Sequence, residues 1–223
     1  MRDKLINFFG RKNIDREFID YFAKYISMYA KDFGLDSNDR LTLFLGQVKA
    51  EMSIRSDGSV RMRENLNYSV GSLMRIFSVY RQNPILAQKH GRSATHRADQ
   101  VAIANTAYMN RNGNTKIDDG YRYRGAGVIQ VTGKGNIEQC LQEVQRVTGI
   151  QIHTRDSVAD DLLSSYTIGI LISMAYWSIN RLYLLTNSRD VTNRVNRGLD
   201  NRSKKLRDYY TQRAKEVFSS SRS

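Results

Sequence analysis

The sequence contains few residues that fix a fold through covalent bonds or rigid turns. It has 1 cysteine and 1 proline among 223 residues. A lone cysteine cannot close an intrachain disulfide, so packing must stabilise the fold. Average usage, about 5%, would give roughly eleven prolines. Because prolines favour turns and interrupt helices, this shortage predicts a helical fold rather than a turn-rich all-β one.

Long apolar runs and metal-ligand patterns are also missing. No apolar run of about 18 residues occurs, and the first ten residues lack the apolar stretch of a signal peptide. The 3 histidines, His90, His96 and His153, are scattered, so no metal or other cofactor is expected. Cys140 is expected to be a partly buried helix residue, not a nucleophile. These absences favour synthesis in a reducing cytoplasm.

The chain carries an excess of positive charge. Its formal net charge is +13, spread along the sequence with some density at residues 204–207. Such a balance predicts an anionic partner: a nucleic acid, a membrane surface or an anionic cell wall. No nucleic-acid-binding motif accompanies the charges, so the sequence favours the wall and disfavours a nucleic acid.

The pattern along the chain indicates one domain. There is no internal repeat and no Pro/Ser/Gly-rich linker, so residues 1–223 are predicted to form a single monomeric domain. Apolar periodicity predicts helices over about 14–33, from Ser37 to about Glu51, over 159–180 as the central buried helix, and over 200–217. The predicted fold is mainly α with a small β element, arranged as two lobes around a cleft.

Residues 121–136 suggest a site for a polar ligand. Short apolar alternation predicts a strand over 127–132, with Gln130 and Thr132 on the same face. Gly125 and Gly127 let the backbone approach a ligand closely. Together with Asn136, this face suits a ligand rich in hydroxyl and amide groups.

Two separated carboxylates complete a possible catalytic set. Glu51 falls near the end of its predicted helix, where the helix dipole disfavours a carboxylate and so helps to keep a general acid protonated. Glu64 lies beyond a predicted loop over 55–59. Two such carboxylates with a sugar-binding face are what a glycoside hydrolase requires. The alternatives are a surface glutamate at 51 and a structural carboxylate at 64 paired with Arg61 or Arg63.

Five segments, in order, resemble glycoside hydrolase family 19 of the bacteriophage endolysin type, which is related to plant chitinases. Segment 64–69 reads ENLNYS, and segment 124–136 resembles the family block RGRG…IQLTG…N. The other resembling segments are 44–51, 104–120 and 191–198. The sequence departs from the family at Ala50, Ala126 and Arg197, where a histidine, an arginine and a glycine are usual.

The resemblance implies a two-lobed, lysozyme-like fold and a catalytic domain without a separate wall-binding module. It implies Glu51 as general acid, Glu64 as base and Thr132 as the residue that holds the attacking water. The substrate-binding residues that it implies are Gln130, Asn136, Tyr108 and Asn196. Packing or capping is the alternative for the last two.

The resulting functional hypothesis is an endolysin that hydrolyses β-1,4 bonds between the amino sugars of peptidoglycan. It would be made in a host cytoplasm and reach the periplasm or cell wall at lysis. A chitinase of the same fold and a non-catalytic glycan-binding protein stay open as alternatives.

Overall fold

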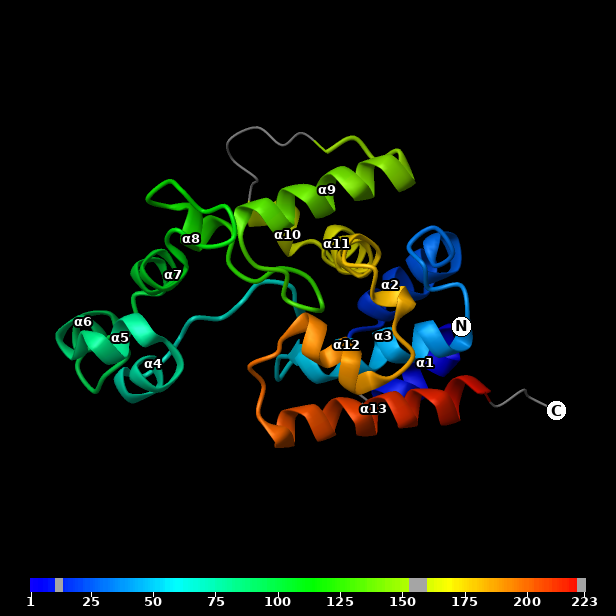
Figure 1. Ribbon diagram of the computed structural model, residues 1–223, viewed down its shortest axis with the longest axis horizontal. Helices are drawn as coiled ribbons and strands as arrows, with labels where there is room; N and C mark the ends of the chain where they lie inside the picture. Colours follow the sequence, from blue (N-terminus) through cyan, green and yellow to red (C-terminus); the bar gives the residue numbers. More distant parts are fainter. Residues whose placement is uncertain (11–13, 153–159, 220–223) are drawn as a thin grey trace.

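The computed structural model describes residues 1–10, 14–152 and 160–219, and helices dominate it (Figure 1). One two-stranded antiparallel sheet pairs β1 (Ser53–Ile54) with β2 (Val60–Arg61), and the predicted loop over 55–59 joins them. The helices are α1 (Arg2–Phe9), α2 (Arg16–Tyr29), α3 (Asn38–Glu51), α4 (Val70–Ile76), α5 (Ser78–Gln82), α6 (Pro84–His90), α7 (Gln100–Tyr108), α8 (Asp119–Arg122), α9 (Lys134–Thr148), α10 (Asp160–Ser164), α11 (Tyr166–Ile179), η1 (Leu182–Leu184), α12 (Ser188–Val195) and α13 (Asn201–Ser219).

Helix α3 carries Glu51 as its last residue, as predicted. The hydroxyl of Ser37 caps its start by accepting from Arg40 N at 3.3 Å. Helix α13 runs along α3 (Figure 1). The two come close together at Gly46, where a Cβ would lie 2.1 Å from Thr211 Oγ1. This close approach lets side chains of α13 reach the end of α3.

The predicted central helix is confirmed, but it is divided. Ser165 separates α10 from α11, and its hydroxyl caps α11 by accepting from Ile168 N at 3.2 Å. Ala159, the predicted first residue, lies outside the described residues. Helix α11 is buried along most of its length, and Trp177 packs edge-on against Phe44 of α3 with ring centroids 5.6 Å apart.

Two hydrophobic cores give the molecule its two lobes. The larger core includes side chains of α1, α2, α3, α9, α11 and α13. The smaller core lies among helices α4–α7, which form a separate group at one side of Figure 1. Its fully buried members are Leu66, Leu73, Tyr80, Ala87, Ile103 and Ala104. The prediction of a mainly α, two-lobed, lysozyme-like fold with a small β element is confirmed; that residues 1–223 act as one catalytic domain stays a prediction.

The predicted strand over 127–132 is wrong. Ala126 and Val131 instead pair with each other, N to O at 2.9 and 2.8 Å, and the residues between them form a turn. Gly127 and Gln130 have positive φ angles of 76° and 57°, which reverse the chain. A Cβ on Gly127 would lie 2.4 Å from Gly169 O, so this turn packs directly against α11.

None of the helices in the described part of the chain is long and apolar enough to cross a membrane.

Candidate active site

A pocket of about 410 Å³ brings together five of the seven predicted site residues. Helix α3 contributes Glu51, and the C-terminal end of α12 contributes Asn196. The turn and the start of α9 contribute Gln130, Thr132 and Asn136. The other lining residues are Asn112, Ile129, Val131, Tyr176 and Val195.

Glu51 forms an ion pair with Arg207 of α13. The side chain of Glu51 is 25% exposed and that of Arg207 is 4% exposed, so the guanidinium reaches the pocket wall from within the protein. Arg207 also donates to Ser203 O at 3.0 Å. Arg207 attracts the carboxylate and fixes its side chain, so the helix dipole is not the only charge that acts on Glu51. Sequence reasoning missed Arg207, although it falls on the buried stripe of α13 that continues at Thr211 and Ala214.

A polar cluster lies beneath Glu51, one turn back along α3. Gln47 is 1% exposed and donates from Nε2 to Thr192 Oγ1 at 3.1 Å, joining α3 to α12. Three other buried atoms, Gln47 Oε1, Thr211 Oγ1 and Arg207 Nε, have no hydrogen-bond partner within the described ranges. The wall behind Glu51 is therefore polar where α3, α12 and α13 meet.

The turn holds its polar side chains by local hydrogen bonds. Gln130 Nε2 donates to Gly127 O at 2.8 Å, Thr132 Oγ1 to Gln130 O at 3.0 Å, and Asn136 Nδ2 to Thr132 O at 2.8 Å. In these bonds the side-chain N–H and O–H groups donate, so the side-chain oxygen atoms are left as acceptors. Acceptors in this wall suit the hydroxyl and N–H groups of an amino sugar, and the lone pairs of the Thr132 hydroxyl suit a water molecule.

Glu64 does not line the pocket, and neutral donors hold it. Tyr108 donates its hydroxyl to the two carboxylate oxygens at 2.8 and 2.9 Å, and Gly125 N donates to Oε2 at 3.2 Å. Burial raises the pKa of Glu64, although the Tyr108 hydrogen bond opposes the rise. Arg63, one of its two expected partners, pairs with Asp160 instead.

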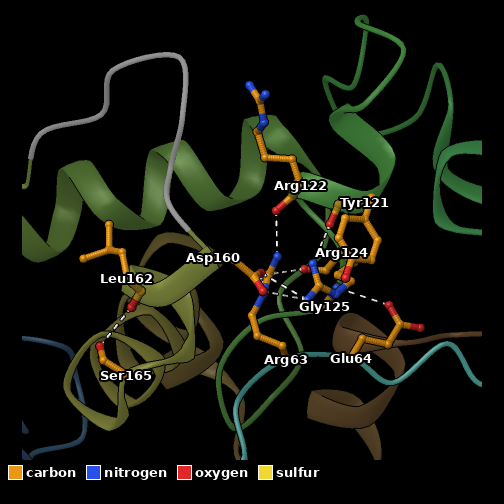
Figure 2. Close-up of polar contacts among 9 residues, drawn as sticks. All are labelled: Arg63, Glu64, Tyr121, Arg122, Arg124, Gly125, Asp160, Leu162 and Ser165. Atoms are coloured by element: carbon orange, nitrogen blue, oxygen red, sulfur yellow. Dashed lines mark hydrogen bonds and ion pairs between the residues drawn. The ribbon is translucent and has the colours of Figure 1, made fainter. Parts of the chain in front are cut away.

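The Arg63–Asp160 pair belongs to a cluster that fixes the backbone beside Glu64 (Figure 2). Arg63 donates to Asp160 Oδ1 at 2.9 Å, to Arg122 O at 2.7 Å and to Arg124 O at 2.9 Å. Arg124 reaches the same carboxylate at 3.1 Å. Burial lowers the pKa of Arg63 to about 10, which still leaves it charged at neutral pH. The cluster therefore fixes the chain immediately before Gly125.

Gly125 connects Glu64 to the pocket. A Cβ at this position would lie 2.7 Å from Gln130 Oε1 and 3.2 Å from Glu64 Cβ. Both side chains therefore lie close to Gly125, and a larger residue there would require the Gln130 amide or the Glu64 side chain to shift. One of the two, Gln130, lines the pocket, and Glu64 does not.

Tyr108 lies outside the pocket lining. Besides bonding Glu64, its ring packs edge-on against Phe77 of the small lobe, with ring centroids 6.1 Å apart. The position is that of a residue that orients Glu64; stacking beneath a sugar ring stays a prediction. Sequence reasoning also missed Asn112 and Tyr176 in the lining. The structure shows Asn112 in the left-handed region, with φ 50°, a conformation that asparagine adopts more readily than most residues.

Other reactive groups lie elsewhere. Cys140 of α9 is 1% exposed, and burial raises the pKa of its thiol to about 12. No group of three or more His, Cys, Asp or Glu side chains that could hold a metal ion occurs in residues 1–10, 14–152 and 160–219; His153 is outside these ranges.

The comparison with known proteins decides the family. No protein-family model matches the chain. A protein of Haemophilus influenzae (strain ATCC 51907 / DSM 11121 / KW20 / Rd), described as a glycosyl hydrolase family 19 domain-containing protein, is 32% identical over 177 residues. The match covers 78% of this chain and 79% of that protein. The chain belongs to glycosyl hydrolase family 19. Family membership makes it a glycoside hydrolase with a glycan substrate.

Proposed function

We propose that this family 19 hydrolase is an endolysin-type enzyme that cleaves β-1,4 bonds between the amino sugars of peptidoglycan. The observation that carries the proposal is the pocket in which Glu51 faces a wall of Gln130, Thr132 and Asn136. A carboxyl group opposite several uncharged hydrogen-bonding groups suits a sugar bound by its hydroxyl and N-acetyl groups.

Glu51 is the proposed general acid, which gives its proton to the oxygen of the leaving sugar. Glu64 is the proposed base, which takes a proton from the attacking water while Thr132 holds that water. Hydrolysis then adds one water across the bond, with the hydroxyl on the anomeric carbon and the proton of the acid on the leaving oxygen. Both groups then return to their starting state, because Glu64 passes its proton to solvent and Glu51 takes one up from solvent.

The position of Glu64 supports inversion. A retaining enzyme needs a carboxylate in direct contact with the anomeric carbon, whereas inverting enzymes place the two carboxyl groups about 6.5–9.5 Å apart to admit a water. Glu64 lies next to Gly125 and outside the pocket lining. A water between Glu64 and the sugar therefore fits this arrangement better than direct attack.

The net charge supports peptidoglycan as the polymer. Chitin is neutral, whereas bacterial walls are anionic, and a protein of charge +13 is attracted to the anionic polymer. The proposal includes action on the wall at lysis after synthesis in the host cytoplasm, by a monomer. A chitinase is the second candidate, since membership in family 19 fits it equally well.

The decisive experiment measures reducing ends released from purified peptidoglycan sacculi and from chitin oligomers. The expected result is release from sacculi, with proton NMR showing that the first product has the inverted anomeric configuration. Efficient cleavage of chitin with untouched sacculi would replace the proposal by a chitinase. Failure on both polymers by the folded protein would leave a glycan-binding protein.

A further inference from the structure

A second hollow lies beside the pocket, around the C-terminal end of α12. Its volume is about 710 Å³. The residues that line it are Leu185, Asp190, Asn193, Arg194, Arg197 and Lys204. The mechanism proposed above uses none of them.

The charge of this hollow is unbalanced. Three of its residues, Arg194, Arg197 and Lys204, are cationic, whereas Asp190 brings one carboxylate that already accepts from Asn187 Nδ2 at 2.7 Å. Within the described residues, the side chains of Arg194 and Arg197 have no ion-pair partner, and Lys204 Nζ donates to Arg197 O at 3.4 Å. A concave surface with uncompensated cations suits an anionic group.

Two arginines near the hollow, unlike Arg194 and Arg197, form ion pairs. Arg189 of α12 pairs with Asp208 of α13, and Arg207 pairs with Glu51. These ion pairs connect helices to one another. The guanidinium groups of Arg194 and Arg197 connect none and remain exposed to solvent. They are therefore available to a ligand.

The hollow is continuous with the catalytic pocket along the chain. Val195 and Asn196 line the pocket, and the residues on either side of them, Arg194 and Arg197, line the hollow. Tyr176, another pocket residue, interacts electrostatically with Arg194. Burial raises the pKa of the Tyr176 hydroxyl, and the charge of Arg194 opposes that rise. The pocket and the hollow therefore adjoin at the C-terminal end of α12.

We infer that the hollow formed by Arg194, Arg197 and Lys204 binds carboxylates carried by the same glycan strand whose sugars occupy the pocket. In peptidoglycan these are the carboxylates of the stem peptides and, on muramic acid units that carry no peptide, the free lactyl carboxylates. The inference rests on the proposed function, because it assumes a glycan in the pocket. It adds a determinant of specificity, through which the enzyme selects acidic strands over neutral ones.

The test measures calorimetric Kd values at low salt for three soluble ligands in a Glu51→Gln background, which slows hydrolysis. The ligands are a neutral N-acetylglucosamine oligomer, an oligomer of alternating N-acetylglucosamine and N-acetylmuramic acid, and the latter carrying stem peptides. The variant is Arg194→Glu/Arg197→Glu. The matched control is Arg202→Glu/Lys205→Glu, because both residues are exposed on α13 and lie outside the hollow lining.

Both double variants lower the net charge equally, because each substitution turns a cation into an anion. We expect Arg194→Glu/Arg197→Glu to weaken binding of the two acidic oligomers roughly tenfold, as the reversal of two exposed ion pairs implies. The control should weaken it by about threefold at most, and the neutral oligomer should bind with nearly unchanged Kd. Arg194→Gln/Arg197→Gln should show a smaller loss in the same direction.

Equal losses in the two glutamate variants would overturn the inference, because net charge alone would then explain them. An equal loss for the neutral oligomer would also overturn it, since the sugar wall would be damaged. The proposed function is tested separately, by measuring whether the wild type hydrolyses the same oligomers. A wild type that binds acidic oligomers through Arg194 and Arg197 but cleaves none would refute the mechanism and support this site.

Discussion

The wall built from α3, α12 and α13 holds Glu51 with a charge, whereas the chain around Gly125 and helix α7 holds Glu64 with neutral donors. Glu51 is partly exposed and pairs with the buried Arg207. Glu64 accepts from a tyrosine hydroxyl and a backbone N–H, and burial raises its pKa. The two carboxylates therefore occupy environments of opposite kind, which is how enzymes give similar groups different roles.

The environments and the positions of the two carboxylates indicate opposite roles. A guanidinium partner is usual for a carboxylate that stays ionised, and burial is usual for one that holds a proton. Environment alone would thus assign acid to Glu64 and base to Glu51. Position favours the opposite assignment, because Glu51 lines the pocket whereas Glu64 does not. Geometry comes before pKa in such an assignment.

The largest effect is expected for Glu51→Gln. General acid catalysis contributes roughly 10²–10⁴-fold, so lysis of sacculi should fall by about that factor. An aryl glycoside whose leaving group needs no proton should recover most of the rate if Glu51 is the acid. The measurement compares kcat/KM for the two substrates, with a thermal melt as the folding control because Arg207 loses its charged partner.

A Glu51→Gln enzyme that is equally slow on both substrates would argue for Glu51 as the base. That result would reverse the roles within the pair while leaving the same two carboxylates in the mechanism.

Glu64→Gln should lower activity on the same scale but should not cost stability. The raised pKa of Glu64 means that ionisation of the folded protein is disfavoured relative to the unfolded chain. This cost is present at pH values above the folded-state pKa and disappears as the pH falls toward the unfolded value. The variant should therefore be at least as stable as the wild type at pH 8, and the difference should shrink by pH 5.

Thermal melts across that pH range measure the difference in stability between the variant and the wild type. For catalysis, Glu64→Ala should be partly rescued by azide, which replaces the activated water and forms a glycosyl azide of inverted configuration. No rescue, with lost stability at pH 8, would make Glu64 a structural carboxylate.

Local sequence signals were enough for α3 and for the polar wall. Ser37 caps the helix and Glu51 ends it, as the pattern predicted. Gln130 and Thr132 line the pocket together, but a strand does not place them there. The same apolar alternation fits a turn in which Val128, Ile129 and Val131 are all buried. The packing of Gly127 against α11 decides between the two, and no local pattern contains it.

Long-range partners explain the rest of what the sequence left open. Arg207 is 156 residues away from Glu51, and Tyr108 is 44 residues away from Glu64. Spacing along a helix or strand says nothing about such pairs. A buried arginine on the core face of α13 does signal that a carboxylate must lie nearby, because an unpaired buried charge is costly.

The smallest and most specific effect is expected for Tyr108→Phe. This change removes the hydroxyl that donates to both oxygens of Glu64 and keeps the ring against Phe77. Because that hydrogen bond lowers the pKa of Glu64, its loss should raise the pKa further. If Glu64 is the base, it must be ionised, so the acid limb of kcat/KM should move to higher pH. Activity should fall several-fold near pH 5 and approach the wild-type value near pH 8.

Tyr80→Phe is the matched control, since Tyr80 also lies in the small lobe but bonds His90 at 2.8 Å instead of Glu64. Uniform loss of activity at every pH in Tyr108→Phe would mean that the tyrosine contacts the substrate or supports the fold. A basic limb that moves while the acid limb stays in place would show that Glu64 works protonated, and the roles inferred from position would then yield to those inferred from environment.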